Sequence, residues 1–255
     1  MLARFDASLN DVSFANLDPT VILRDIEEQP VEEDMETAKR SIHPGTRLTF
    51  RIRRKMSIRL TFNVREYNMA ARAAVMDRIA DWVGDGGWLV LSTRPDQRLY
   101  VHPDTLPSMG SSLRWTDDLE MVLTAYERPF FEARWPVQSV ISDSGILIPT
   151  GTFATAHVEA DVVNEGESDL TTITLTCADT QITLTGLAVP AGEHVRLYYT
   201  DRDVLVIEAA GVSALANRTA ESHDDLIARS RKQNDIVVTA DQPVTAIFSA
   251  RGRFR

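Results

Sequence analysis

The residue types of a hydrolase triad stand side by side in Ser222-His223-Asp224-Asp225. A triad needs its serine, histidine and carboxylate to converge from separate elements, and neighbours along one chain do not easily reach that geometry. The same four residues are typical of a capped turn or a short helix start, because Ser and Asp oxygens accept hydrogen bonds from free amides there. We therefore expect Ser222 or Asp224 to act as a cap and predict no catalytic residue.

A second group of chemically capable residues is His157, Glu159 and Asp161, which alternate along a predicted strand and so share one face. Three such side chains could hold a divalent ion, but an exposed polar strand face explains them more simply. Residues 84–87 (Gly-Asp-Gly-Gly) follow a predicted helix and lack the spacing of a phosphate-binding loop. Cys177 lies among threonines and is expected to be a small buried side chain rather than a nucleophile. No metal and no cofactor is predicted.

Residues 47–101 contain the clearest secondary-structure pattern in the first half of the chain. It predicts a strand, a tight reversal, a second strand over 57–65, one helix and a third strand from Trp88. In 57–65 the apolar residues expected to face one side are Ile58, Leu60, Phe62 and Val64. Asn68 is the expected N-cap of a helix over 69–83. The apolar stripe of that helix comprises Val75, Met76, Ile79, Ala80 and Val83.

Two runs of opposite charge flank one another in this half. The acidic run over 25–36 is predicted to be a solvated loop or arm, because Pro30 interrupts it. The basic run covers 47–65. Both runs are explained by solvated faces, or else acid and base meet across subunits of an oligomer. The candidate inter-protomer residues are Asp25, Glu27, Glu28, Glu32, Glu33, Arg51, Arg53, Arg54, Lys55 and Arg59.

Three further strands are predicted in the first half: Thr20–Leu23, Arg98–His102 and one within 117–126. A turn is predicted at residues 94–96 (Arg-Pro-Asp). In 117–126 the residues expected to face inward are Leu119, Met121, Leu123 and Ala125. Trp135-Pro136 marks the expected boundary between a domain of residues 1–134 and a domain of residues 135–255.

Beyond this boundary short β-rich runs recur between turns, which suits an antiparallel sandwich or jelly roll. The runs are Ile146–Ile148, Thr152–Val163, Leu170–Cys177, Gln181–Leu187, His194–Tyr199, Val204–Ala209, Ile236–Thr239 and Val244–Ser249. The fold class predicted for the whole chain is therefore mainly β with one prominent α-helix.

Composition limits the remaining classes. The net charge of −10 disfavours a general affinity for nucleic acid or anionic lipid. A single cysteine excludes an intrachain disulfide framework. No apolar run approaches the ~20 residues of a membrane span, and the first residues lack the layout of a secretory signal. We expect synthesis in a cytoplasm and no membrane partner.

Several segments together resemble the distal tail protein (Dit) family of siphophages and prophages. In the first half they are residues 57–67 (SIRLTFNVREY), the helix to Trp82, and residues 86–89 and 92–95. In the second half they are residues 163–166, 182–186, 191–193, 217–226 and 248–254. The similarity covers nearly the whole chain. One departure is the segment 231–235 (Arg-Lys-Gln-Asn-Asp), where relatives often place a glycine ahead of the asparagine.

The resemblance implies an N-terminal sandwich- or barrel-like domain that closes a homo-hexameric ring, and a C-terminal galectin-like jelly-roll domain outside it. The implied function is a baseplate hub in the virion, at the tip of a long non-contractile tail. Its implied partners are the tail tube protein, the tail-associated tip protein, and further the tape-measure and receptor-binding proteins. DNA would pass through the channel without specific binding. The alternatives are a carbohydrate-binding accessory module of the tail tip and a cell-wall hydrolase, for which no motif is present.

Overall fold

The computed structural model describes residues 5–39, 46–107 and 117–254, and of these 35–39 and 46–51 by their backbone alone. The chain forms two compact units, Met1–Phe131 and Glu132–Arg255. The division thus falls shortly before Trp135-Pro136. Both units are built from antiparallel strands, and the helix α1 (Met69–Val83) belongs to the first. A mainly β chain with one prominent helix is therefore confirmed for the described residues.

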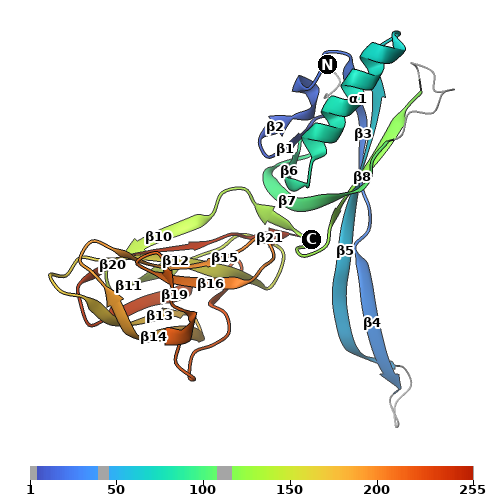
Figure 1. Cartoon of the computed structure of the whole chain (residues 1–255). Helices are drawn as coiled ribbons and strands as arrows, with labels where there is room; N and C mark the ends of the chain where they lie inside the picture. The colour runs from blue at the N-terminus through green and yellow to red at the C-terminus, as the bar shows by residue number, and fades with distance from the viewer. Residues whose placement is uncertain (1–4, 40–45, 108–116, 255) are drawn as a thin grey trace. The chain divides into compact units, whose positions relative to one another are not determined.

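The first unit is a sheet with the strand order β2-β1-β6-β7-β8-β5-β3, and β4 pairs with a separate part of β5. Figure 1 shows α1 lying against this sheet. The strands are β1 (Ala7–Leu9), β2 (Val12–Ser13), β3 (Val21–Glu28), β4 (Glu32–Lys39), β5 (Thr46–Val64), β6 (Gly87–Leu91), β7 (Arg94–Thr105) and β8 (Leu119–Ala125).

The expected reversal before residue 57 is wrong, because β5 is one strand of 19 residues. Its middle, residues 53–56 (Arg-Arg-Lys-Met), contains no Gly, Pro or Asn that would turn the chain. The predicted inward face is confirmed, since Ile58, Leu60, Phe62 and Val64 are buried. Asn63, on the other face, is buried as well, and its amide donates to the carbonyl oxygen of Asp117 at 2.9 Å.

The acidic run is not a loop. Its residues form most of β3 and β4, which separate only at residues 29–31 around Pro30. The prediction of a loop for residues 25–36 is wrong because acidic residues are usually depleted in strands, so the local sequence shows no sign of β3 and β4 there. Here they face a basic strand, and that cross-strand partner is not visible in the local sequence. The predicted turn at 94–96 is also wrong: Leu91 pairs with Arg94, so the chain reverses at Ser92-Thr93.

The helix follows the prediction with one exception. The side-chain oxygen of Asn68 accepts from the amides of Ala70 (2.9 Å) and Ala71 (3.3 Å), which confirms the N-cap. Val75, Ile79 and Val83 are buried, but Ala80 is exposed. Arg72, which was not expected to be buried, lies on the same stripe as Val75, Ile79 and Val83, and its long side chain is buried there.

The second unit is a sandwich of two antiparallel sheets. One has the order β10-β20-β12-β15-β16-β17, with β18 paired to β12, and the other the order β11-β19-β13-β14. The strands of these sheets are β10 (Val137–Ile141), β11 (Ser144–Leu147), β12 (Thr155–Asn164), β13 (Leu170–Cys177), β14 (Thr180–Val189), β15 (His194–Tyr199), β16 (Leu205–Ala209), β17 (Val212–Ser213), β18 (Ile227–Arg229), β19 (Asn234–Ala240) and β20 (Val244–Ala250). β9 (Phe131–Ala133) spans the division between the units and pairs with β21 (Arg253–Phe254), which lies in neither sheet.

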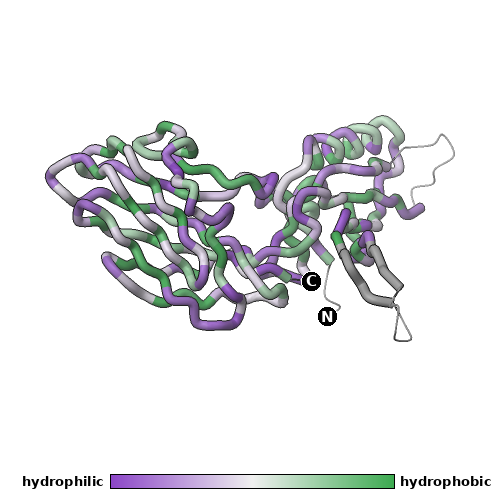
Figure 2. The backbone as a smooth tube through the Cα atoms, turned by 90° about the horizontal axis from the view of Figure 1, so that it is seen from below, coloured by the Kyte–Doolittle hydropathy of each residue, from purple (hydrophilic) through white to green (hydrophobic). Residues whose placement is uncertain are grey.

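Hydrophobic and hydrophilic residues alternate along these strands, as Figure 2 shows for the second unit. The inward residues of both sheets form one core, which includes Val158, Val162, Leu175, Ile236 and Phe248. Each predicted run of this half contains a strand. β10, β17, β18 and β21 were not predicted, because two to five residues carry too little periodicity.

The segment around Arg231, where relatives often place a glycine, forms a turn in this chain. Arg231 adopts a left-handed backbone with φ of 59°, a conformation that glycine takes at no steric cost. Asn234 holds the turn from inside: its amide donates to the carbonyl oxygens of Leu147 (3.0 Å), Arg229 (2.9 Å) and Lys232 (2.8 Å). The asparagine thus fixes the loop despite the strained arginine.

Candidate interaction surfaces

The two charge runs meet within one chain along the β4–β5 pair. Glu33 Oε1 lies 3.4 Å from Arg53 Nε, and Glu32 Oε2 lies 3.3 Å from Lys55 Nζ. Asp34 Oδ2 lies 2.6 Å from Arg54 Nη2. The first two pairs follow from the register, in which Glu32 is opposite Lys55 and Glu33 opposite Arg53, whereas Asp34 is opposite Ile52. At a surface each such pair contributes about 0–1 kcal/mol.

The remaining candidates extend the pattern toward the body of the first unit. Arg59 Nη1 lies 3.3 Å from Glu27 on β3. Glu28 accepts a bidentate pair from Arg94 at 2.7 and 2.8 Å. Asp25 accepts from the amide of Ile26, and the side chain of Arg51 lies outside the described part. The described contacts pair eight of these ten charges within one chain, and an inter-protomer interface at these residues stays a prediction.

The β4–β5 pair forms a two-stranded ribbon that projects beyond the rest of the first unit (Figure 1). β8 pairs with β5 only from Met56 to Phe62, and β3 only from Ile58 to Val64. Among the described strands, the part of β5 before Met56 therefore has β4 alone beside it. A two-stranded ribbon of this kind is marginally stable in water by itself.

Ser222 and His223 cap a sheet edge rather than a helix or an active site. Ser222 Oγ accepts from the Thr183 amide at 2.9 Å and lies 3.1 Å from the Thr183 carbonyl oxygen. His223 Nδ1 accepts from the Gln181 amide at 3.1 Å, and the His223 amide donates to the Gln181 carbonyl oxygen. These bonds saturate the outer edge of β14. The serine is held by a strand and not by a base, and no triad forms.

Asp224, the motif's carboxylate, instead accepts from Arg218 at 2.8 Å. Asn217 completes the edge cap, because its amide donates to the carbonyl oxygens of Thr185 and Gly186, both at 2.9 Å. An exposed strand edge offers a template for pairing with another chain. The segment 217–223 covers the edge of β14, because its polar side chains bind backbone groups there that could otherwise pair with another strand.

His157, Glu159 and Asp161 do share one face of β12, but they do not converge. Asp161 Oδ1 lies 2.7 Å from His194 Nδ1, whereas Glu159 lies 3.5 Å from Ser249 Oγ. His157 turns to Asp203 and Arg253. In the described part of the chain no three His, Cys, Asp or Glu side chains are grouped to hold a metal ion.

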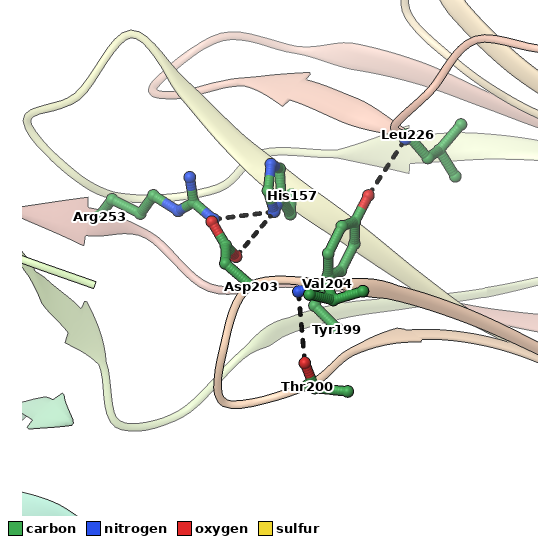
Figure 3. A network of polar contacts seen from close by, with 7 residues as sticks. All are labelled: His157, Tyr199, Thr200, Asp203, Val204, Leu226 and Arg253. Atoms are coloured by element: carbon green, nitrogen blue, oxygen red, sulfur yellow. Dashed lines mark hydrogen bonds and ion pairs between the residues drawn. The ribbon is translucent and has the colours of Figure 1, made fainter. Parts of the chain in front are cut away.

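Figure 3 shows the network around His157. Its Nδ1 lies 2.8 Å from Arg253 Nη2 and 3.1 Å from Asp203 Oδ1. Its ring stacks on Tyr199 at 4.1 Å between centroids. The Tyr199 hydroxyl accepts from the Leu226 amide at 3.3 Å, and burial raises the pKa of that hydroxyl. The network joins β12, β15, the β15–β16 turn and β21, so it is a structural clasp.

Two features remain. Cys177 is fully buried, and this burial raises the pKa of its thiol to about 12, so it is no nucleophile at neutral pH.

The outer face of the larger sheet holds an open groove of about 410 Å³. The polar side chains lining it are Gln138, Glu159, Asp161, Arg196, Tyr198, Glu208 and Ser249. In the sequence these residues are only scattered polar positions on five separate strands.

No helix in the described part is long and apolar enough to cross a membrane.

No protein-family model matches the sequence, and no curated protein matches it. Solved structures do match. The SPP1 Dit protein, described as a paradigm of the hub adsorption apparatus in phages that infect Gram-positive bacteria, has a TM-score of 0.71 at 11% identity, over 97% of this chain and 98% of that one.

Two structures of the phage P2 baseplate in its activated conformation also match. The one with Ca has a TM-score of 0.58 at 6% identity, over 99% of this chain and 98% of that chain. The one with Sr has a TM-score of 0.55 at 7% identity, over 97% of both chains. At these identities the likeness establishes the fold. This chain has the fold of the SPP1 Dit protein and of a phage baseplate component over nearly its whole length.

Proposed function

We propose that this protein is a structural hub of a phage tail tip, a homo-hexameric ring that joins the tail tube to the baseplate and leaves a channel for DNA. The observation that carries the proposal is the fold likeness to a hub protein over 97% of one chain and 98% of the other, which includes both units in one order. A likeness confined to one sandwich would support no such role, because sandwiches serve many functions.

The β4–β5 ribbon supports ring formation. In a cyclic hexamer each protomer contributes one surface and receives a different one. A projecting ribbon whose β5 edge is unpaired before Met56 suits the contributed surface, since a neighbouring chain would stabilise it. The residues proposed to lie near this contact are those of the two charge runs, with Arg53 and Arg54 on the ribbon itself.

The second domain, residues 135–255, would act as a galectin-like scaffold outside the ring, holding other baseplate parts. Its capped β14 edge suits a domain that must not pair indiscriminately with neighbours. The first domain, residues 1–134, would contact the tail tube protein on one side and the tail-associated tip protein on the other. The role is mechanical, and no catalytic residue is assigned.

The test is the mass and shape of the purified protein, alone and mixed with a tail tube protein from the same genome. Six copies of 28.5 kDa give a ring of about 171 kDa, measurable by light scattering after size exclusion. Negative-stain images should show annular particles with six-fold symmetry. Monomers at every concentration, with and without the tube protein, would refute the proposal.

A further inference from the structure

The outer face of the larger sheet in the second unit carries the groove described above, and the function proposed for the ring does not use it. We propose that this face binds an extended segment of a partner protein that presents apolar side chains at one end and lysine or arginine at the other. The inference concerns the second unit by itself and does not depend on ring closure.

One row of directly paired residues crosses five strands of this face. The cross-strand register joins Val140 to Ile247, Ile247 to Asp161, Asp161 to Arg196, and Arg196 to Glu208. Paired side chains on one face lie about 5 Å apart. The row is therefore apolar at its β10–β20 end and charged from β12 to β16, and it spans about 20 Å by the usual strand spacing.

The polar groups of the groove are held in place. Asp161 is bound by His194 at 2.7 Å and by Arg196 at 3.5 Å. The Tyr198 hydroxyl donates to Glu208 at 2.9 Å. Groups already fixed lose little conformational entropy on binding a ligand. The lining residues belong to five neighbouring strands, so a bound segment would have to be extended to reach all of them.

Charge selects a cationic partner. The groove holds three carboxylates, Glu159, Asp161 and Glu208, against the one guanidinium of Arg196. Asp161 pairs with that guanidinium and with His194. Among the described contacts, Glu159 and Glu208 are bound only by hydroxyl groups, those of Ser249 and Tyr198. These two carboxylates keep their charge available to an incoming lysine or arginine, and complementary charge also speeds encounter.

The apolar end of the row favours a protein over a sugar. Val140 is 66% exposed and Ile247 37% exposed, and they stand directly opposite each other on β10 and β20. A valine or leucine side chain would remove this surface from water. A glycan would engage the carboxylates and Tyr198 but gain less from this aliphatic pair. The two ends together match a segment with apolar residues at one end and basic residues at the other.

The probe is a blocked peptide, Val-Ser-Val-Ser-Lys-Ser-Lys, labelled for fluorescence anisotropy, whose alternate residues face the sheet. We expect binding to the full-length protein with a Kd below about 1 mM at low salt, weakening as salt rises. A peptide with Glu in place of Lys should not bind, and one with Ser in place of Val should bind at least tenfold more weakly. Absence of binding, or equal binding of the Glu peptide, would overturn the proposal.

The double variant Glu159→Gln/Glu208→Gln should weaken binding of the lysine peptide at least tenfold. Its matched control is Glu165→Gln/Glu167→Gln, which makes the same charge change in the exposed β12–β13 loop and should bind like the parent. A glycan array is run on the same proteins. Glycan binding that is lost in the groove variant, with no peptide binding, would assign the face to a sugar and reject the proposal.

Discussion

Arg253 Nη2 lies 2.8 Å from His157 Nδ1, and this contact ties the C-terminal strand β21 to β12. A guanidinium only donates hydrogen bonds, so Nδ1 of His157 is the acceptor in this contact. The same Nη2 donates to both carboxylate oxygens of Asp203, at 3.0 and 3.2 Å. The arginine therefore contacts both His157 and Asp203, which also lie 3.1 Å from each other.

The first prediction concerns this clasp. Arg253→Gln should lower the free energy of unfolding of the second unit by about 1–3 kcal/mol, because hydrogen bonds to charged groups are lost and a half-buried carboxylate stays behind. Chemical denaturation of the full chain measures it. Lys232→Gln removes a cation from an exposed turn and serves as the control. Equal midpoints for the two variants would show that Arg253 holds nothing in place.

The second prediction concerns Cys177, the one cysteine of the chain. Its thiol pKa of about 12 leaves almost no thiolate at pH 8, and burial excludes reagents as well. A thiol reagent such as dithionitrobenzoate should therefore leave the native protein unmodified and release one equivalent per chain in denaturant. Rapid native labelling at pH 8 would contradict both the burial and the raised pKa.

The third prediction concerns Asp18, before β3. The hydrogen bond from the Thr20 hydroxyl, at 2.6 Å, lowers the pKa of the Asp18 carboxyl below its ordinary value of 3.8, and the Thr20 amide and Arg78 act in the same direction. A lowered pKa in the folded state stabilises the protein above pH 3.8, and this contribution disappears as the pH falls through the folded value.

Asp18→Asn should accordingly lower the melting temperature at pH 7 by a small amount, since the carboxylate lies near solvent. The difference between variant and parent should shrink steadily as the pH is lowered below 4. Melting curves at a series of pH values measure it, with Asp11→Asn as the exposed control. A difference that grows toward low pH would have the wrong sign for this explanation.

The sequence predicts those parts of the fold whose signal lies within about ten consecutive residues. The alternation of Ile58, Leu60, Phe62 and Val64, the cap at Asn68 and the eight predicted β-rich runs of the second unit are local patterns, and the structure confirms them. The prediction of a loop for the acidic run is wrong because Glu32 and Glu33 pair with Lys55 and Arg53 across the ribbon. Their stabilising partners lie some twenty residues away, beyond any local window.

The candidate sites show the same limit. His223 and Ser222 contain catalytic residue types, yet their roles are fixed by Gln181 and Thr183 on another strand. The groove on the larger sheet combines residues of β10, β12, β15, β16 and β20, so that only the strand register brings Val140 into line with Glu208. Strand register is set by the turns and by the whole hydrophobic pattern, so it cannot be read residue by residue from the local sequence.

The last prediction separates the two accounts of the charge runs. If the pairs Glu33–Arg53 and Asp34–Arg54 act within one chain, then Arg53→Glu/Arg54→Glu should destabilise the ribbon of an isolated protomer, since like charges then face each other across it. Adding Glu33→Arg/Asp34→Arg in the same chain should restore it. Hydrogen exchange of ribbon amides at dilute concentration measures both effects.

If instead acid and base meet across subunits, the two half-variants should rescue each other when mixed. Arg53→Glu/Arg54→Glu protein and Glu33→Arg/Asp34→Arg protein would then assemble together but not alone, as light scattering would show. From the distances of 3.4 and 2.6 Å within one chain, we expect rescue in the combined chain and none on mixing. The opposite result would move the contact to the interface, because surface pairs of about 0–1 kcal/mol can be exchanged between chains at little cost.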